Sequence, residues 1–507
     1  MSQAGTRSAA AKAATALARL TSARRALIHP APAPALGPSD DQSELPRRKS
    51  AVHVLSLLLV WLTIASGAYV AIEPAPVDLL TVGLIVLLPA VGLCAISTVH
   101  LAYLILWLVV TAAGFVAATV ADEVGTATMH MAVSLYLCLA SFVFAAFIAR
   151  RPENHARLIF NAYATAAVVV AMAGVVGYLD LLPGLKNLLT VHSRASAGFK
   201  DPNVYSAFLV PPLVYLLHRA IQARTVTVLV PAGGLAMLSL ALLVSFSRGA
   251  WVNAAVAVLV YGWLSLIVAS TNRQRVKLVL LGAFGVAVSA LLIAAALEID
   301  AVAKLFEQRA SLDQGYDQGP EGRFGGQLKA WDYIIANPLG IGALQFGGIL
   351  HPEQPHNVYL SMLLYTGWVG GLVYILLIGL TLVWGLSAIL RRQWTSPLLV
   401  VAYAAFVGLV VEGFVIDTDH WRHFYLVMGL VWGLMLITPR RSAAPALAPA
   451  RIRTARLVAA AQPRRPGRIL GRAPQMLPPG LLMRELPRRR RRRRTPKRKP
   501  RIVSVRH

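Results

Sequence analysis

The sequence predicts an all-α polytopic membrane protein with about twelve transmembrane helices. Of the 507 residues, 57% are hydrophobic and only 14% are charged, against roughly a quarter in soluble domains. The mean hydropathy is +0.61. Apolar runs long enough to cross about 30 Å of hydrocarbon recur along the chain, and a basic tail lies at each end of them.

The net charge of +27 is concentrated in these tails. Residues 1–50, rich in Ala and Pro, hold eight Lys or Arg against three acids, and residues 439–507 hold twenty-two against Glu485 alone. The segment between them is nearly neutral, so the charge gives no reason to expect a nucleic-acid partner. We expect two cytoplasmic tails, the Arg-rich second one disordered, that contact anionic lipid headgroups.

The membrane domain is expected at residues 51–438. Its second and third apolar runs are separated only by a minimal turn at Ser97–His100. Neither Cys94 nor Cys138, both in apolar runs, suggests a disulfide framework. The twelve runs cover residues 51–72, 77–97, 99–121, 127–149, 157–181, 203–218, 225–246, 249–269, 276–297, 357–388, 397–416 and 421–438.

Loop charges predict the orientation of these helices. The loops that carry Lys or Arg are residues 150–156, 219–224, 270–277 and 389–396. The alternate short loops, 73–76 and 121–126, carry acids and neither Lys nor Arg. By the positive-inside rule the basic loops and both termini are cytoplasmic, and an even number of helices agrees with this. Loops 182–202 and 298–356, the latter between helices nine and ten, then face the outside, which is the periplasm in a Gram-negative bacterium.

The longer outer loop contains a predicted amphipathic helix and ends at a histidine. Asn337-Pro338 should end the helix, and glycines after it let the chain turn back toward His356, which opens the next apolar run. A helix of this kind is expected to lie on an apolar surface. Four apolar side chains are predicted on one face of it: Leu328, Trp331, Ile334 and Ile335.

Three arginines, Arg194, Arg248 and Arg323, lie on separate outward segments. The turn Ser245–Gly249 places Arg248 at a helix N-terminus, where a cation opposes the helix dipole unless an anion binds there. The alternative is that Arg248 extends to lipid headgroups. Because guanidinium groups bind phosphate oxygens in a bidentate manner, the three arginines predict a diphosphate site. Asp201-Pro202 predicts an N-cap and the first residue of the next helix.

His356 is the nearby side chain best suited to proton transfer, and we expect it to act as a general base, although a lone histidine at a membrane boundary is often structural. Asp417, Asp419, His420 and His423 could ligate a metal, but their spacing matches no common ligand pattern and Arg422 would repel a cation. We therefore expect neither metal nor cofactor. The residues expected to support the site or to bind sugar are Lys200, Asn357, Glu412, Asp417, Asp419, His420 and Arg422.

The order of SRASAGFKDPN, SFSRGAW, GR…AWDYIIANPLGIG and PHNVYL…GWVGG resembles the O-antigen ligase family, which includes the related Wzy-type polymerases, over roughly residues 180–435. Arg194, Arg248 and His356 match the two arginines and the histidine of that family's motifs. The basic C-terminal tail and the DTDHWRH turn match no part of its general pattern.

The resemblance implies a GT-C-like helical fold in the bacterial inner membrane. It implies metal-independent, inverting transfer of glycan from undecaprenyl diphosphate to a glycan or glycolipid acceptor on the periplasmic side, in lipopolysaccharide assembly. A polymerase with the same motifs remains an alternative. So does a flippase or other transporter without chemistry, although ionisable groups at the outer rim rather than at mid-membrane favour an enzyme.

Overall fold

The computed structural model describes residues 47–223, 225–269, 271–298, 303–304, 319–391 and 397–436. The chain divides into two units, Met1–Pro439 and Arg440–His507, and every described residue belongs to the first. The expected N-terminal tail lies outside the described residues except for 47–50, and the expected C-terminal tail lies wholly outside them.

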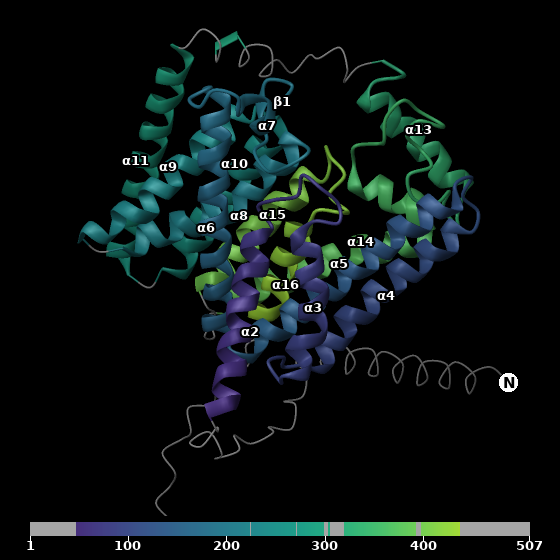
Figure 1. The fold of residues 1–507 in the computed structure, drawn as a ribbon, viewed down its shortest axis with the longest axis horizontal. Coiled ribbons are helices and arrows are strands. Elements are labelled where there is room, and N and C mark those ends of the chain that lie inside the picture. The colour runs from purple at the N-terminus through teal and green to yellow at the C-terminus, as the bar shows by residue number, and fades with distance from the viewer. Residues whose placement is uncertain are drawn as a thin grey trace, which may run out of the picture. The chain divides into compact units, whose positions relative to one another are not determined.

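The described chain is almost entirely helical, as apolar runs must be in a lipid environment, where backbone groups need partners within their own segment. Its elements, shown in Figure 1, are α2 (Arg47–Ser66), α3 (Pro76–Ala90), α4 (Thr98–Ala118), α5 (Val124–Arg150), α6 (Pro152–Tyr178), α7 (Lys186–Leu189), β1 (Thr190–Val191), β2 (Arg194–Ala195), α8 (Pro202–Gln222), η1 (Thr225–Val228), α9 (Leu229–Val244), α10 (Arg248–Val268), α11 (Asn272–Leu297), α13 (Arg323–Ala336), α14 (Val358–Leu390), α15 (Pro397–Glu412) and α16 (Arg422–Met435).

Every predicted apolar run overlaps one of these helices. Within the described residues, seven helical segments are long and apolar enough to cross a membrane: Thr98–Ala118, Val124–Arg150, Pro152–Tyr178, Pro202–Gln222, Thr225–Val244, Arg248–Val268 and Val358–Leu390. Three more apolar helices are shorter. Membrane-spanning helices are thus present, while the full number of twelve and the side that each loop faces stay predictions.

The start of α8 agrees with its capping signal, whereas the boundary between α3 and α4 differs from the prediction. The Asp201 side chain accepts a hydrogen bond from the Asn203 N–H and α8 begins at Pro202, as predicted. The prediction of a run through residue 97 was wrong, because α3 ends at Ala90 and Gly92 then has a φ of +73°. Ser97 is not a turn residue but the N-cap of α4.

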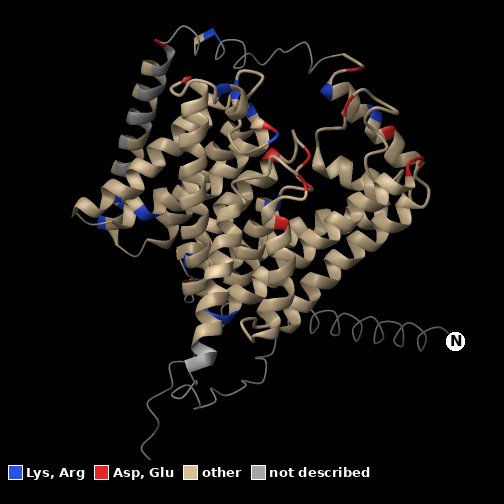
Figure 2. Cartoon of the chain, viewed as in Figure 1, with Lys and Arg blue, Asp and Glu red and all other residues tan. Residues whose placement is uncertain are grey.

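Helices α15 and α16 are buried on nearly all sides, which fits their uniformly apolar sequences. In the ribbon of Figure 1, α15 contacts α10, and α16 contacts α5 and α15. Figure 2 shows that acidic and basic residues are sparse along the helices and gather in the loops at their ends. The turn between α15 and α16 therefore brings polar side chains to the ends of several surrounding helices.

Helix α13 confirms the amphipathic helix predicted in the long loop, but not all of its predicted face. Leu328, Trp331 and Ile335 are exposed, whereas Ile334 is buried. Around the helix axis, Ile334 lies just beyond the edge of the arc formed by the other three side chains. This edge is turned toward α14, and the Trp368 Nε1–H of α14 donates to the Ile334 carbonyl oxygen at 2.7 Å. Placing Ile334 on the same face as the other three was wrong.

Candidate functional site

The C-terminal end of α15 is where the segments that carry most of the predicted site residues meet. Glu412, the last residue of α15, accepts a hydrogen bond from the Asn253 amide of α10 at 2.6 Å. The next carbonyl, of Gly413, accepts one at 2.9 Å from the N–H of Val358, the first residue of α14. The start of α10 and the start of α14 are therefore both tied to the same stretch of two residues.

The turn that carries Arg248 packs directly on Glu412. Ser247 is the N-cap of α10 and accepts a hydrogen bond from the Ala250 N–H, so Arg248 is the first residue of the helix, as predicted. A Cβ atom on Gly249 would lie 3.3 Å from Glu412 Oε1, closer than most side-chain contacts. Glycine at this position lets the first turn of α10 approach the buried carboxylate.

Arg194 reaches the same turn from the loop before α8. The short hairpin of β1 and β2 pairs Val191 with Arg194. From there the Arg194 Nε–H donates to the Ser245 carbonyl at 2.7 Å, and its Nη2 donates to Asn203 Oδ1 at 2.7 Å. Arg194 is thus hydrogen-bonded to the turn that immediately precedes Arg248. The segments that carry these two predicted arginines are therefore in direct contact.

His356 lies between two carboxylates that differ in exposure. Its Nε2 is 3.1 Å from Glu353 Oε2, and its Nδ1 is 3.9 Å from Asp417 Oδ2. The Glu353 side chain is 60% exposed and that of Asp417 is 18% exposed. One ring nitrogen thus faces the open side of the site and the other faces its interior. The φ of His356 is +49°, a costly conformation for a non-glycine residue that clusters at functional sites.

Asp417 and Asp419 lie two residues apart on one turn, in different surroundings. Asp417 accepts a hydrogen bond from the Ser361 hydroxyl at 2.5 Å, and burial together with the charge of Asp419 raises the pKa of Asp417 above its usual range. Burial acts in the same direction on Asp419, but the hydrogen bond and the charge of His130, 2.8 Å away, outweigh it and lower the pKa of Asp419 below its usual range.

His130 was not among the predicted site residues. It lies in α5, inside an apolar run and 289 residues from Asp419 in sequence. Its ring stacks on that of His420 with a centroid separation of 3.7 Å, and His420 Nε2 lies 3.0 Å from the Ser134 hydroxyl one turn further along α5. The one available signal was an ionisable side chain within a predicted span, which is by itself a marker of function.

These residues also form the one group with clustered metal-ligand atoms in the described part of the chain. The candidate ligand atoms of His130, Asp419 and His420 lie within 4.8 Å of one another. The hydrogen bond between His130 and Asp419 and the contact of His420 with Ser134 account for this grouping. His423, which the sequence had grouped with them, is not part of this group and lines a cavity.

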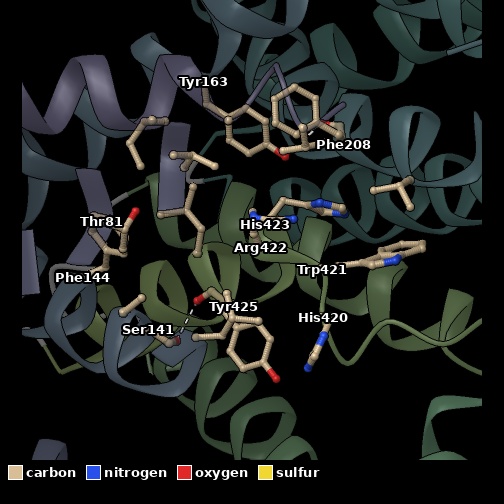
Figure 3. A pocket seen from close by; sticks show the side chains of 18 of the residues that line it. Thr81, Ser141, Phe144, Tyr163, Phe208, His420, Trp421, Arg422, His423 and Tyr425 are labelled. Carbon is tan, nitrogen blue, oxygen red and sulfur yellow. Dashed lines mark hydrogen bonds between the residues drawn. The ribbon is translucent and has the colours of Figure 1, made fainter. Parts of the chain in front are cut away.

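That cavity has a volume of about 70 Å³ and lies beneath the turn that joins α15 to α16. Figure 3 shows the His423 ring among apolar and aromatic side chains, including Phe208 and Tyr163. Its lining includes His420 and Arg422 but not His356, Arg194 or Arg248. The cavity is therefore distinct from the place where the arginine segments and His356 meet.

The other predicted residues have contacts that explain their positions without a sugar. Arg422 forms a bidentate ion pair with Asp78 of α3, at 2.6 and 2.7 Å. Lys200 lies 3.5 Å from Glu73 at an exposed position. Asn357 caps α14 by accepting hydrogen bonds from two backbone N–H groups. Arg323 is the first residue of α13, and its approach to the other two arginines stays a prediction.

Residues 233–375 match the protein family described as O-antigen ligase. This stretch of the chain is similar to that family. The O-antigen ligase match contains Arg248, Arg323 and His356, whereas Arg194 and the Asp417–Arg422 turn lie outside it. No curated protein matches the sequence. The match supports a membrane-bound, glycosyltransferase-like enzyme of the ligase and polymerase superfamily, with lipid-linked glycans as its class of substrate.

Proposed function

We propose that the chain is an O-antigen ligase-type glycosyltransferase that moves glycan from undecaprenyl diphosphate to a hydroxyl group of an acceptor sugar, on the periplasmic side of the inner membrane. The acceptor would be lipid A-core or a similar glycolipid. The observation that carries the proposal is that the Arg194 segment, the Arg248 turn and the segment of His356 meet around Glu412 and Gly413. Arg248 and His356 both lie within the family match.

His356 would act as the general base. Its Nε2 faces Glu353 on the exposed side, so an acceptor would enter there and take the place of the Glu353 carboxylate beside the ring. As the acceptor oxygen attacks C1 of the donor sugar, its proton would pass to Nε2. Asp417, on the Nδ1 side, would stabilise the imidazolium that forms.

The leaving group is undecaprenyl diphosphate, which receives the electron pair of the C1–O bond as that bond breaks. Attack on C1 from the opposite face inverts the anomeric centre. Arg194 and Arg248 would place positive charge at the phosphate oxygens where negative charge develops, and Arg323 would be a third cation there. This scheme uses side chains in place of a metal or a cofactor.

Helix α13 would hold the long loop at the membrane surface. Its exposed apolar side chains, Leu328, Trp331 and Ile335, form the kind of face that rests among lipid headgroups and the first carbons of the acyl chains. Because both substrates of the proposed reaction are borne by lipids, a loop anchored at this depth would keep the site at the level of the diphosphate. The same face supplies no reason to prefer one acceptor over another.

A polymerase would use the same chemistry with a second lipid-linked glycan as acceptor, and a flippase would move the glycan without forming a bond. One experiment separates the three. Deletion of the gene should leave full-length glycan on undecaprenyl diphosphate and the acceptor unmodified, as judged by lipid extraction and gel analysis of surface polysaccharide. Attached chains that are uniformly short would indicate a polymerase, and donor retained on the cytoplasmic face would indicate a flippase.

A further inference from the structure

His130 is a buried polar side chain that the proposed reaction does not use. It lies in α5, with its side chain only 9% exposed, and Nε2 directed at Asp419 Oδ2, 2.8 Å away. Two aromatic rings also contact it: the ring of His420 stacks on the His130 ring, and the ring of Tyr365 meets it edge to face with a centroid separation of 5.3 Å. An ionisable residue in an apolar span is costly to keep unless its contact serves a purpose.

The contact of His130 leads to His356 in two steps. Asp419, which His130 holds, lies two residues from Asp417 on the same turn, and Asp417 Oδ2 is 3.9 Å from His356 Nδ1. The Tyr425 hydroxyl donates to the Asp419 backbone carbonyl at 2.7 Å, which fixes the main chain of the turn from α16. Residues of α5 and α16 therefore hold the turn whose other carboxylate, Asp417, faces the ring of His356.

The surroundings show why the His130 contact matters. Two carboxylates lie close together in a largely buried site, and each needs donors of its own. Asp417 has the Ser361 hydroxyl, and Asp419 has His130. The other ionisable groups nearby are Glu353 on the loop side and His420 on the α5 side, while Arg422 is engaged with Asp78 of α3.

Without His130, the Asp419 carboxylate would be buried with no side-chain donor among the described residues. An unsatisfied buried carboxylate draws in other donors, and the ring of His420, with a nitrogen within 4.8 Å of the Asp419 carboxylate, lies beside it on the same turn. The turn from Asp417 to His420 would then rearrange, and the side of His356 that receives charge during transfer would lose its partner.

We propose that His130 is a positioning residue of the transfer reaction, which holds Asp419 so that Asp417 is left to pair with His356. This inference rests on the proposed function, because it needs His356 to be the base. It extends the site from the outer loops to the side of α5, which neither the family match nor the motifs include.

The test compares His130→Leu with His130→Gln in the purified full-length protein, with a lipid-linked oligosaccharide as donor. Leucine removes the contact to Asp419, and the expected result is a fall in kcat of about ten- to a hundredfold with little change in KM for the donor, as is typical when the partner of a functional side chain is lost. Glutamine retains an N–H donor that can reach Asp419, and should recover most of kcat. Failure of glutamine to recover more kcat than leucine would contradict the proposal.

The matched control is His155→Leu. His155 is also buried in a helix, stacked on Phe147 and bonded to the Phe147 carbonyl at 2.6 Å, but it has no contact with the proposed site. If both leucine variants lose activity only in proportion to the loss of folded protein, measured by gel filtration and thermal denaturation in detergent, His130 is merely structural and the inference is overturned.

Asp419→Asn is the second variant, needed if His130→Leu does not fold. It keeps the shape of the side chain but replaces the charge-assisted contact with His130 by a weaker neutral one, so the turn is held less firmly and kcat should fall to a similar extent. Wild-type kcat in folded Asp419→Asn overturns the inference. His356→Ala is assayed in parallel, and retained activity in that variant contradicts the proposed base. If His356→Ala is inactive while His130→Leu and Asp419→Asn both keep wild-type kcat, only the role of His130 is overturned.

Discussion

His356 Nδ1 lies 3.9 Å from Asp417 Oδ2, too far for a hydrogen bond and close enough for an ion pair once the ring is protonated. The Ser361 hydroxyl, 2.5 Å from the other carboxylate oxygen, fixes the orientation of Asp417. Contacts between catalytic groups of the length seen for His356 and Asp417 commonly tighten in the complex with substrates. The pair therefore suits a base that becomes charged during the reaction.

Asp417→Asn should lower kcat by at least about tenfold while changing KM for the donor little. Asparagine still accepts the Ser361 hydrogen bond, but its neutral amide cannot stabilise an imidazolium at Nδ1. Transfer assays with purified protein and a lipid-linked oligosaccharide check this. Asp180→Asn, at an exposed loop position next to α6, is the control. An unchanged kcat in Asp417→Asn would show that Asp417 has no role in the reaction.

The same substitution should stabilise the protein at neutral and alkaline pH. Because burial and the charge of Asp419 raise the pKa of Asp417, its carboxyl binds a proton more tightly in the folded state than in the unfolded one. Its contribution to stability is therefore greatest at low pH and is lost as the pH rises from the ordinary carboxyl range near 4 toward neutrality. Asparagine does not ionise, so it escapes this loss.

Thermal denaturation in detergent between pH 4 and pH 8 measures the effect. The melting temperature of Asp417→Asn should exceed that of the wild-type protein at pH 8, and the difference should shrink toward pH 4. A difference that is constant with pH, or that grows as the pH falls, would mean that Asp417 ionises without cost in the folded protein. A gain in stability together with a loss of turnover would identify Asp417 as a residue kept for function.

Arg194→Lys should reduce transfer by about tenfold or more even though the positive charge is kept. Lysine has no planar fork, so it cannot donate to both the Ser245 carbonyl and Asn203 while facing a phosphate. Initial rates across a range of donor concentrations would show a higher KM for the donor. Arg157→Lys, in an exposed pair with Glu153, should behave as wild type. Equal activity in the two variants would mean that Arg194 acts only as a diffuse charge.

The proposed orientation is testable by labelling with an impermeant thiol reagent. In a protein in which Cys94 and Cys138 are replaced by serine, cysteines introduced at residues 194 and 356 should react in intact cells whose outer membrane has been made permeable. Cysteines at residues 273 and 391 should react only after the inner membrane is opened, because their loops are basic. The reverse pattern would place the candidate site in the cytoplasm.

Much of this fold follows from local features of the sequence. Apolar runs locate the helices, and single capping residues such as Asp201 and Ser247 fix where α8 and α10 begin. The end of α3 was missed because the helix stops at Ala90, just before Gly92 with its positive φ, within a run whose apolar character continues and so gives no sign of the break. Ile334 was misplaced since its orientation depends on the contact of α13 with α14, a tertiary feature.

The candidate site was predictable only in part. Arg194, Arg248 and His356 stand out because they are polar groups at the ends of apolar runs, and the contacts around Glu412 bring their segments together. His130 was hidden within a span, and its pairing with Asp419 joins residues 289 positions apart. Long-range packing of α5 against α16 creates this contact, and no local pattern in the sequence encodes it.

The most direct test of the whole account is the rate of glycan transfer by His356→Ala, measured with purified protein, a lipid-linked oligosaccharide donor and its acceptor. Donor binding should remain near the wild-type level, and the kcat should fall by about a hundredfold or more, the usual contribution of a general base. His356→Arg should be no better, since arginine cannot accept a proton. A folded His356→Ala variant that retains activity within about tenfold of wild type would show that His356 is structural and that the proposed mechanism is wrong.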